Sequence, residues 1–344
     1  TLFPYTTLFR SQRVFPVVTK DNARRGGNDS KMIATTNITG NGTQTKTFEI
    51  LVCSPVWVVE FKQQSISFST INILLSIAAI LGNSLIPVAL HKESSLHPPS
   101  KLFYRCLATT DLLVGLISQP LCATYSMSVV HEHWSLCRCA RDACYISGFM
   151  LSGVSLFTMA AISVDRLLAL LSGLRYKEIV TMRCTYIILA IVWVVCLVAG
   201  LSFHLNYHIA FSYTLIGISS CLAISIASYT KIFRALSHHQ AQIQDHVHQQ
   251  SSQLNALNME RYRKAVYSAL WVQLALFVCY VPQFTVQIVI SLSTKRFSNL
   301  FTFLGMANVL VFFNSTLNTF LYYWKISEVR RAVKQTIRQA ICYA

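Results

Sequence analysis

The stretch S-L-F-T-M-A-A-I-S-V-D-R-L-L-A-L, from Ser155 to Leu170, places an Asp-Arg pair at the end of an apolar run. The run has no charged residue from Ala143 to Val164, and it predicts a helix long enough to cross a membrane. Charges are costly to place at the end of such a helix, so Asp165 and Arg166 are candidates for a functional site. The alternative is that both are interfacial charges that mark where the lipid ends.

The composition of the whole chain also indicates a membrane protein. Hydrophobic residues make up 53% of the sequence and charged residues 12%, with a mean hydropathy of +0.46. This leaves too little polar surface to cover a soluble globule. We expect the net charge of +16 to reflect basic residues gathered at one membrane face, so nucleic acid is not an indicated partner. The 11 Cys residues lack the paired spacing of a zinc site or a dense disulfide framework.

Six apolar runs follow one another along the chain, at 66–90, 106–130, 143–164, 184–230, 265–294 and 297–324. Five of them have roughly the 20 residues that a membrane-spanning helix needs. The fourth would form a helix of about 70 Å, more than twice the thickness of the hydrocarbon core, so it must contain two spans. Its only polar interruption, His204–His208, is interpreted as a very short turn. The fold expected for 65–324 is therefore an all-α bundle of seven transmembrane helices.

The two ends of the chain differ in character from this bundle. Residues 1–11 match the translation of a common sequencing adapter, and we exclude them as an assembly artefact. Residues 12–64 are polar and contain three glycosylation sequons, at Asn28, Asn37 and Asn41, which favours an extracellular tail. In residues 325–344 the apolar residues recur at helical spacing on one face and the basic residues lie on the other. This pattern predicts an amphipathic helix on the inner leaflet of the bilayer. Cys342 in this segment is a lipidation candidate.

The distribution of basic residues predicts the orientation in the membrane. One set of loops holds most of the Lys and Arg residues, including those after Trp324. The other side holds five: Lys62, Arg138, Arg141, Lys295 and Arg296. Because basic loops stay inside, we expect a multi-pass plasma-membrane protein with an extracellular N-terminus.

Most of the expected helices carry a short motif. In chain order these are G-N-S at 82–84, L-A-T-T-D at 107–111, S-V-D-R at 163–166, Trp193, Tyr229, F-V-C-Y-V-P at 277–282 and N-S-T-L-N-T-F-L-Y-Y at 314–323. In this order and spacing, the set resembles the rhodopsin-like (class A) G-protein-coupled receptors from about residue 66 to 342. The resemblance implies a receptor, not an enzyme, that binds an extracellular ligand and activates a heterotrimeric G protein.

The resemblance also implies which residues form the switch. These are Asp165, Arg166, Tyr229, Tyr280, Pro282, Asn318 and Tyr322. Asp165 is expected to hold Arg166 in an inactive ion pair. Four residues depart from the family pattern: Leu167 replaces the usual Tyr, Tyr280 the usual Trp, and Thr319 and Cys221 the usual Pro of the seventh and fifth helices.

A buried acid is expected in the second helix, because Asp111 is the only acidic residue in the middle of a span. Such a carboxylate must be neutralised or partnered. Asn314 and Asn318 are four residues apart and share one helix face. The resemblance implies a sodium ion held by Asp111, Ser155, Asn314 and Asn318; the alternative is a protonated Asp111 that is hydrogen-bonded to the amides. No other cofactor is expected.

The outer cysteines depart from the family as well, because the His204–His208 turn offers no Cys for the bridge that the resemblance implies. An outer disulfide would have to join Cys53, Cys122, Cys137, Cys139 or Cys144 among themselves. The candidates for such a bridge are Cys53, Cys137, Cys139 and Cys144, with Cys53 paired to Cys137 or Cys139 as the preferred arrangement. The short loop and the absent Pro resemble the melanocortin and related lipid-receptor branch.

The sequence argues against two ligand classes and two other functions. The position of the amine-binding Asp in the family is held by Gly148, with Asp142 further out, so a biogenic amine is disfavoured. No Lys lies in 297–324, so retinal is disfavoured too. The alternatives to a receptor are a metal-dependent membrane hydrolase using His204 and His208, for which no third ligand is evident, and a transporter, for which no internal repeat is found.

Overall fold

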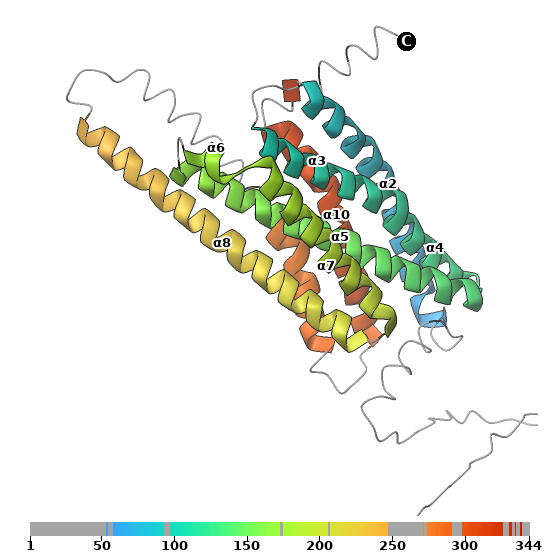
Figure 1. Ribbon diagram of the computed structural model, residues 1–344. Helices are drawn as coiled ribbons and strands as arrows, with labels where there is room; N and C mark the ends of the chain where they lie inside the picture. The colour runs from blue at the N-terminus through green and yellow to red at the C-terminus, as the bar shows by residue number, and fades with distance from the viewer. Residues whose placement is uncertain are drawn as a thin grey trace, which may run out of the picture.

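The computed structural model describes Cys53, residues 58–92, 97–172, 175–205, 207–246, 274–290 and 298–325, and the single positions 271, 330, 331, 334 and 338. Within these residues the chain folds into long helices that pack side by side (Figure 1). The helices, in chain order, are α2 (Val58–Lys92), α3 (Pro98–Leu113), η2 (Val114–Ser118), α4 (Gln119–Val130), α5 (Trp134–Ser172), α6 (Tyr176–Ile179), α7 (Met182–Leu205), α8 (Tyr207–His246), the unlabelled helix Leu274–Ile290, and α10 (Ser298–Lys325).

The seven expected spans are all present as helices. Six stretches of the described chain are long and apolar enough to cross a membrane, with α3, η2 and α4 forming one continuous span at Pro98–Val130. The seventh, Leu274–Ile290, is apolar but shorter. The long fourth run does divide in two, because α7 ends at Leu205 and α8 begins at Tyr207. The prediction of an all-α, seven-helix membrane protein is therefore confirmed.

Several helices are longer than the apolar runs predict. α5 begins at Trp134, before the charge-free run that starts at Ala143, and α8 extends to His246, well beyond the end of the apolar run at 230. Hydrogen bonding along a helix continues past the lipid boundary as long as the side chains tolerate water, so hydropathy alone does not define helix ends. After α10, Arg330, Arg331, Lys334 and Arg338 are helical and exposed, as the basic face of an amphipathic helix would be.

The bundle is polar in places inside and apolar outside. Large apolar side chains such as Leu74, Val194 and Ile216 are more than half exposed, as side chains that face lipid would be. α5 is the central helix, because it packs against α3, α4, α7 and α8. Its buried side chains run from Cys137 at one end of the bundle to Asp165 at the other. We call these two ends the Cys53 end and the Asp165 end.

Helices α2 and α10 are joined by a polar contact where the family pattern has a proline. Thr319 Oγ1 donates a hydrogen bond to Asn83 Oδ1 at 2.8 Å, and Asn83 Nδ2 donates to the backbone oxygen of Ser315 at 3.0 Å. Gly82 lets the helices approach, because a Cβ at this position would lie 2.6 Å from Thr319 Cγ2. Thr319 therefore bonds α10 to α2, which a proline at this position could not do.

Gly82→Ala is expected to destabilise the purified chain by about 1–3 kcal/mol through overpacking at Thr319. The β-branched Thr319 cannot turn away without losing its bond to Asn83. The control is Gly217→Ala, whose Cβ would lie 3.6 Å from the Phe157 ring, an ordinary contact. Both variants gain the same helix propensity, so the difference between their melting temperatures in detergent reports the clash. Equal melting temperatures would show that α2 and α10 can separate freely here.

Candidate functional site

Asp165 accepts three hydrogen bonds at one end of α5. Tyr176 Oη donates to Asp165 Oδ1 at 2.6 Å, and Ser100 Oγ donates to Oδ2 at 2.9 Å. The third donor is Arg166, whose Nη2 lies 2.8 Å from Oδ2 in a salt bridge. The Asp165 side chain is only 2% exposed, so these donors replace the hydration that a buried carboxylate loses.

Arg166 is held less tightly than its partner. Its Cζ lies 5.9 Å from the centroid of the Tyr104 ring, within the range of a cation–π contact. The Arg166 side chain is 32% exposed, and among the described residues its Nε has no hydrogen-bond partner. Arg166 therefore retains donor capacity that another molecule could use if the ion pair opened.

Tyr176 is a partner of Asp165 that the motifs did not reveal. It lies on the short helix α6, outside the membrane-spanning segments, with its ring centroid 5.1 Å from that of His97. Burial and the hydrogen bond to Asp165 raise the pKa of Tyr176 to about 12, so it remains a donor at neutral pH. Ser100 Oγ lies 3.0 Å from Tyr176 Oη and completes the cluster. No sequence spacing links Ser100 or Tyr176 to an Asp-Arg pair, which is why the sequence did not indicate them.

Asp111 lies within the bundle with no exposed surface. Ser155 Oγ donates to Asp111 Oδ1 at 3.0 Å, and Asn318 Nδ2 donates to Oδ2 at 3.0 Å. The structure thus brings together side chains from α3, α5 and α10. Asn314 is buried one turn away, but its Nδ2 lies 4.0 Å from Met159 Sδ, and no hydrogen bond joins it to Asp111.

The remaining switch residues lie on other helices. Tyr229 on α8 is buried, with its Oη 3.4 Å from Ser163 Oγ of α5. Tyr280 is also buried and donates to the backbone oxygen of Ser152 at 3.2 Å. Pro282 lies within the helix Leu274–Ile290 and is partly buried. The side chain of Tyr322 lies outside the described residues.

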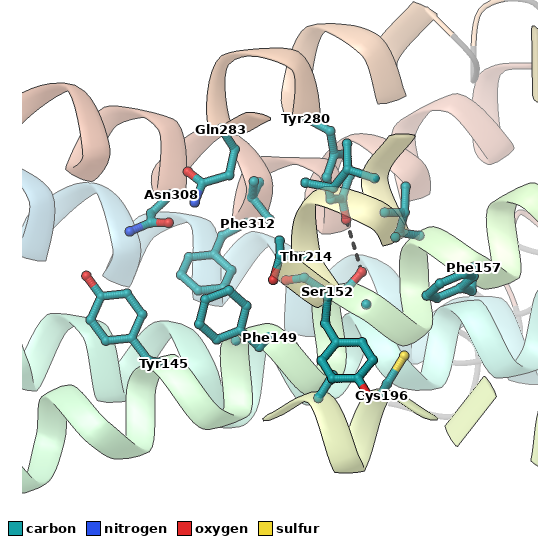
Figure 2. Close-up of a pocket in the computed structure, with 18 of the residues that line it drawn as sticks. Tyr145, Phe149, Ser152, Phe157, Cys196, Thr214, Tyr280, Gln283, Asn308 and Phe312 are labelled. Atoms are coloured by element: carbon teal, nitrogen blue, oxygen red, sulfur yellow. Dashed lines mark hydrogen bonds between the residues drawn. The ribbon is translucent and has the colours of Figure 1, made fainter. Parts of the chain in front are cut away.

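A cavity of about 240 Å³ lies between these groups and the Cys53 end. Its walls come from α4, α5, α7, α8, the helix Leu274–Ile290 and α10. Figure 2 shows Gln283, Asn308 and Tyr145 at one end of the cavity and Phe157 and Cys196 at the other. Tyr280, a switch residue, lines the same cavity, as does Ser152 of α5, whose backbone oxygen accepts its hydrogen bond. A ligand bound here would therefore contact both partners of this bond. The sequence indicated few of the other lining residues, because they are uncharged side chains within apolar helices.

Two disulfides connect segments at the Cys53 end. Cys53 is bonded to Cys137 at the start of α5, with their Cα atoms 5.9 Å apart. Cys122 of α4 is bonded to Cys144 of α5, with their Cα atoms 5.2 Å apart. Cys139 is an exposed free thiol. Both bridges use only cysteines from the set expected at the outer face.

Some sequence-based candidates cannot be located in this structure. Asn28, Asn37, Asn41 and Cys342 lie outside the described residues. Within the described residues, no three His, Cys, Asp or Glu side chains come close enough to hold a metal ion between them. The part of the chain that the structure describes therefore shows no centre of the kind that a metal-dependent hydrolase uses.

Comparison with known proteins agrees with the helical architecture. A family model described as 7 transmembrane receptor (rhodopsin family) matches residues 82–322. The chain is 31% identical over 150 residues to the adenosine receptor A2b of Rattus norvegicus, 29% over 138 residues to the adenosine receptor A3 of Ovis aries, and 29% over 155 residues to the histamine H2 receptor of Cavia porcellus. These alignments cover 44%, 40% and 45% of this chain and 44%, 42% and 42% of the respective relatives.

The chain thus aligns with less than half the length of each of these relatives. The family model, by contrast, covers well over half of the chain and includes every span from the end of α2 to α10. This family consists of membrane receptors rather than enzymes. The chain therefore belongs to the rhodopsin family of seven-transmembrane receptors.

Proposed function

We propose that the chain is a ligand-activated receptor that promotes nucleotide exchange on a heterotrimeric G protein. The observation that carries the proposal is the position of α5. This helix lines the cavity, its Ser155 hydroxyl donates a hydrogen bond to Asp111, and the Asp165 cluster lies near its end. A ligand that displaces the cavity-facing part of α5 can therefore bias the arrangement at its far end. In the resting state Asp165 holds Arg166, and in the active state Arg166 is released to contact the G protein.

We further propose that the receptor lies in the plasma membrane with the Cys53 end outside. The basic residues of the loops and the sequons of the N-terminal tail support this orientation. The Asp165 end then faces the cytoplasm, where the G protein would bind. Protease protection of epitope tags placed before Cys53 and after Trp324 tests the orientation. Protection of the N-terminal tag in intact cells would overturn it.

The ligand that we propose is uncharged rather than a cationic amine. Two relatives are named for adenosine, which is neutral, and one for histamine, which is largely cationic at neutral pH. Among the described residues no Asp or Glu lines the cavity, and Gly148 occupies the expected amine position, where a Cβ would lie 3.4 Å from the Phe312 ring. A buried cation without a carboxylate partner would be strongly disfavoured.

The experiment that tests this proposal compares adenosine with histamine in cells that express the full chain and reporters for each G-protein class. We expect neutral compounds, with adenosine as the first one tested, to raise signalling and histamine to have no effect. The Arg166→Ala variant at matched surface expression is the control, since it should respond to neither. A histamine response that the variant lacks would overturn the neutral-ligand proposal while supporting the receptor function.

We also propose that a sodium ion binds beside Asp111 in the resting state. Hard cations prefer oxygen ligands, and the buried Oδ1 atoms of Asn314 and Asn318 have no hydrogen-bond partner among the described residues. Together with the Asp111 carboxylate and the Ser155 hydroxyl, these atoms would supply a set of four oxygen-bearing side chains. The ion would neutralise the buried carboxylate.

Sodium is expected to lower ligand-independent nucleotide exchange by the wild-type receptor, because the ion stabilises the resting packing of α3, α5 and α10. The measurement replaces sodium with N-methylglucamine at constant ionic strength, which separates site binding from general screening. Asp111→Asn keeps the shape of the side chain but should remove the sodium dependence. If both proteins respond alike to sodium, Asp111 is a protonated, hydrogen-bonded core residue and the ion site is absent.

A further inference from the structure

The walls of the cavity are unusually free of charge for a site within a basic protein. Among the described residues its lining includes no Lys, Arg, His, Asp or Glu, whereas Phe149, Phe157 and Phe312 present three aromatic rings to it. Arg141 and Asp142 form a salt bridge with each other, with 2.9 Å between Nη2 and Oδ1, and neither residue is among those that line the cavity. The described walls therefore favour a ligand that carries no net charge, and the aromatic rings favour an apolar body.

One end of the cavity is nevertheless built to hydrogen-bond. Gln283 is only 6% exposed and lines the cavity, yet its Oε1 has no hydrogen-bond partner among the described residues. Asn308 and Tyr145 lie at the same end (Figure 2). A buried amide oxygen left without a donor is unfavourable, so a ligand donor such as an amide or hydroxyl hydrogen would be strongly preferred there.

The opposite wall of the cavity faces the bilayer. Val195 of α7 and Tyr213 and Ile216 of α8 line the cavity, although they are 44%, 48% and 67% exposed. Their neighbours in the lining are the small residues Ala199 and Gly217, also from α7 and α8. Small residues at these positions leave little side chain to close this part of the cavity. The cavity therefore adjoins the lipid-facing surface along the boundary of α7 and α8.

We propose that the cavity binds a neutral amphiphile, with an alkyl or other apolar body and an uncharged hydrogen-bonding head, that enters from the bilayer between α7 and α8. The head would contact Gln283 and Asn308, and the apolar body would lie against the Phe157 and Cys196 end of the cavity. This inference rests on the proposed receptor function and specifies the class of its ligand. It also explains why the receptor can lack any ionic anchor in the cavity, because the bilayer itself concentrates such a ligand.

The test is photocrosslinking of the purified full chain in phosphatidylcholine nanodiscs. Three probes share one long alkyl chain with a diazirine and differ only in the head: a primary amide, a carboxylate and a trimethylammonium group. Labelling is normalised to the amount of each probe in the nanodisc and mapped by mass spectrometry. We expect the amide to label peptides that contain Phe149–Phe157 or Tyr213–Gly217, and each charged probe to label them about tenfold less. Equal labelling by all three would overturn the charge selectivity.

Substitutions separate the cavity from the surrounding lipid. Gly217→Trp should fill the cavity and reduce amide labelling of the α5 peptide about tenfold, since a Cβ at Gly217 meets only the Phe157 ring at 3.6 Å. The matched control is Ile226→Trp, which adds the same ring to an exposed position of α8 that is not part of the lining. Labelling that falls equally in both variants, or in neither, would show that the probe reports annular lipid.

Two further measurements do not depend on Gly217→Trp folding correctly. Excess non-photoreactive amide should compete for wild-type labelling, and a failure to compete would overturn the site. Gln283→Leu, which keeps the side-chain size, should reduce labelling by the amide probe but not by a probe that ends in a methyl group. Equal loss of both would assign Gln283 a structural role only. Because crosslinking needs no G protein, its outcome is independent of whether nucleotide exchange is observed.

Discussion

Arg166→Ala is expected to abolish G-protein activation while leaving the receptor at the cell surface. The Arg166 side chain contributes little to the fold, because it is 32% exposed and is held by one ion pair and one ring contact. Its loss does remove the charge partner of Asp165, but Tyr176 and Ser100 still donate to that carboxylate. The free donor capacity of Arg166 would be used by the G protein, so its removal should reduce exchange to the level of membranes without the receptor.

The measurement compares nucleotide exchange at matched surface expression. Arg175→Ala is the control, since it removes a different, exposed basic side chain from the Asp165 end of the molecule. We expect the control to retain most of the wild-type activity. If Arg166→Ala promotes nucleotide exchange at the wild-type rate, Arg166 has no role in coupling. If both variants lose exchange activity equally, the cause is the general loss of positive charge at this end of the molecule.

Asp165→Asn is expected to raise ligand-independent exchange, because the amide keeps the size of the side chain but removes the charge that holds Arg166. A bias of about 1–3 kcal/mol between the two states would raise the active population roughly 5- to 150-fold where that state is rare. Tyr176→Phe should give a smaller increase, since it removes one donor at 2.6 Å but leaves the ion pair.

The readout for this prediction is basal exchange in the absence of any added compound. Glu178→Gln is the control, because Glu178 is an exposed acid on α6, close in sequence to Tyr176 but outside the Asp165 cluster. Basal activity in Asp165→Asn equal to that of wild type would mean that Asp165 and Arg166 are only interfacial charges.

The seven-helix fold could be predicted from the sequence because hydrocarbon imposes a minimum length on every span. The same constraint divided the run 184–230, and the structure confirmed the division, since α7 ends at Leu205 and α8 begins at Tyr207. The family resemblance was confirmed as well, since its motifs follow one another in order. The resemblance to the melanocortin and lipid-receptor branch stays a prediction.

The partners of the predicted residues could not be read from the sequence in the same way. Tyr176 and Ser100 reach Asp165 from other helices, and no local pattern encodes such a meeting. Likewise, Gln283 is an ordinary polar residue in an apolar helix until the fold places it in the cavity. Thr319 was identified only as a replacement for the usual Pro, whereas the structure shows that it donates a hydrogen bond to Asn83. Contacts between distant segments depend on packing, which periodicity does not specify.

The measurement that tests the central claim most directly is basal nucleotide exchange by the double variant Asp165→Asn/Arg166→Ala, reconstituted with purified G protein. If Asp165 acts by restraining Arg166, freeing a residue that is absent can have no effect. The account therefore predicts that the double variant is as silent as Arg166→Ala, although Asp165→Asn alone is more active than wild type. A double variant that keeps the raised activity of Asp165→Asn would show that Asp165 acts through another part of the receptor, and would contradict the account.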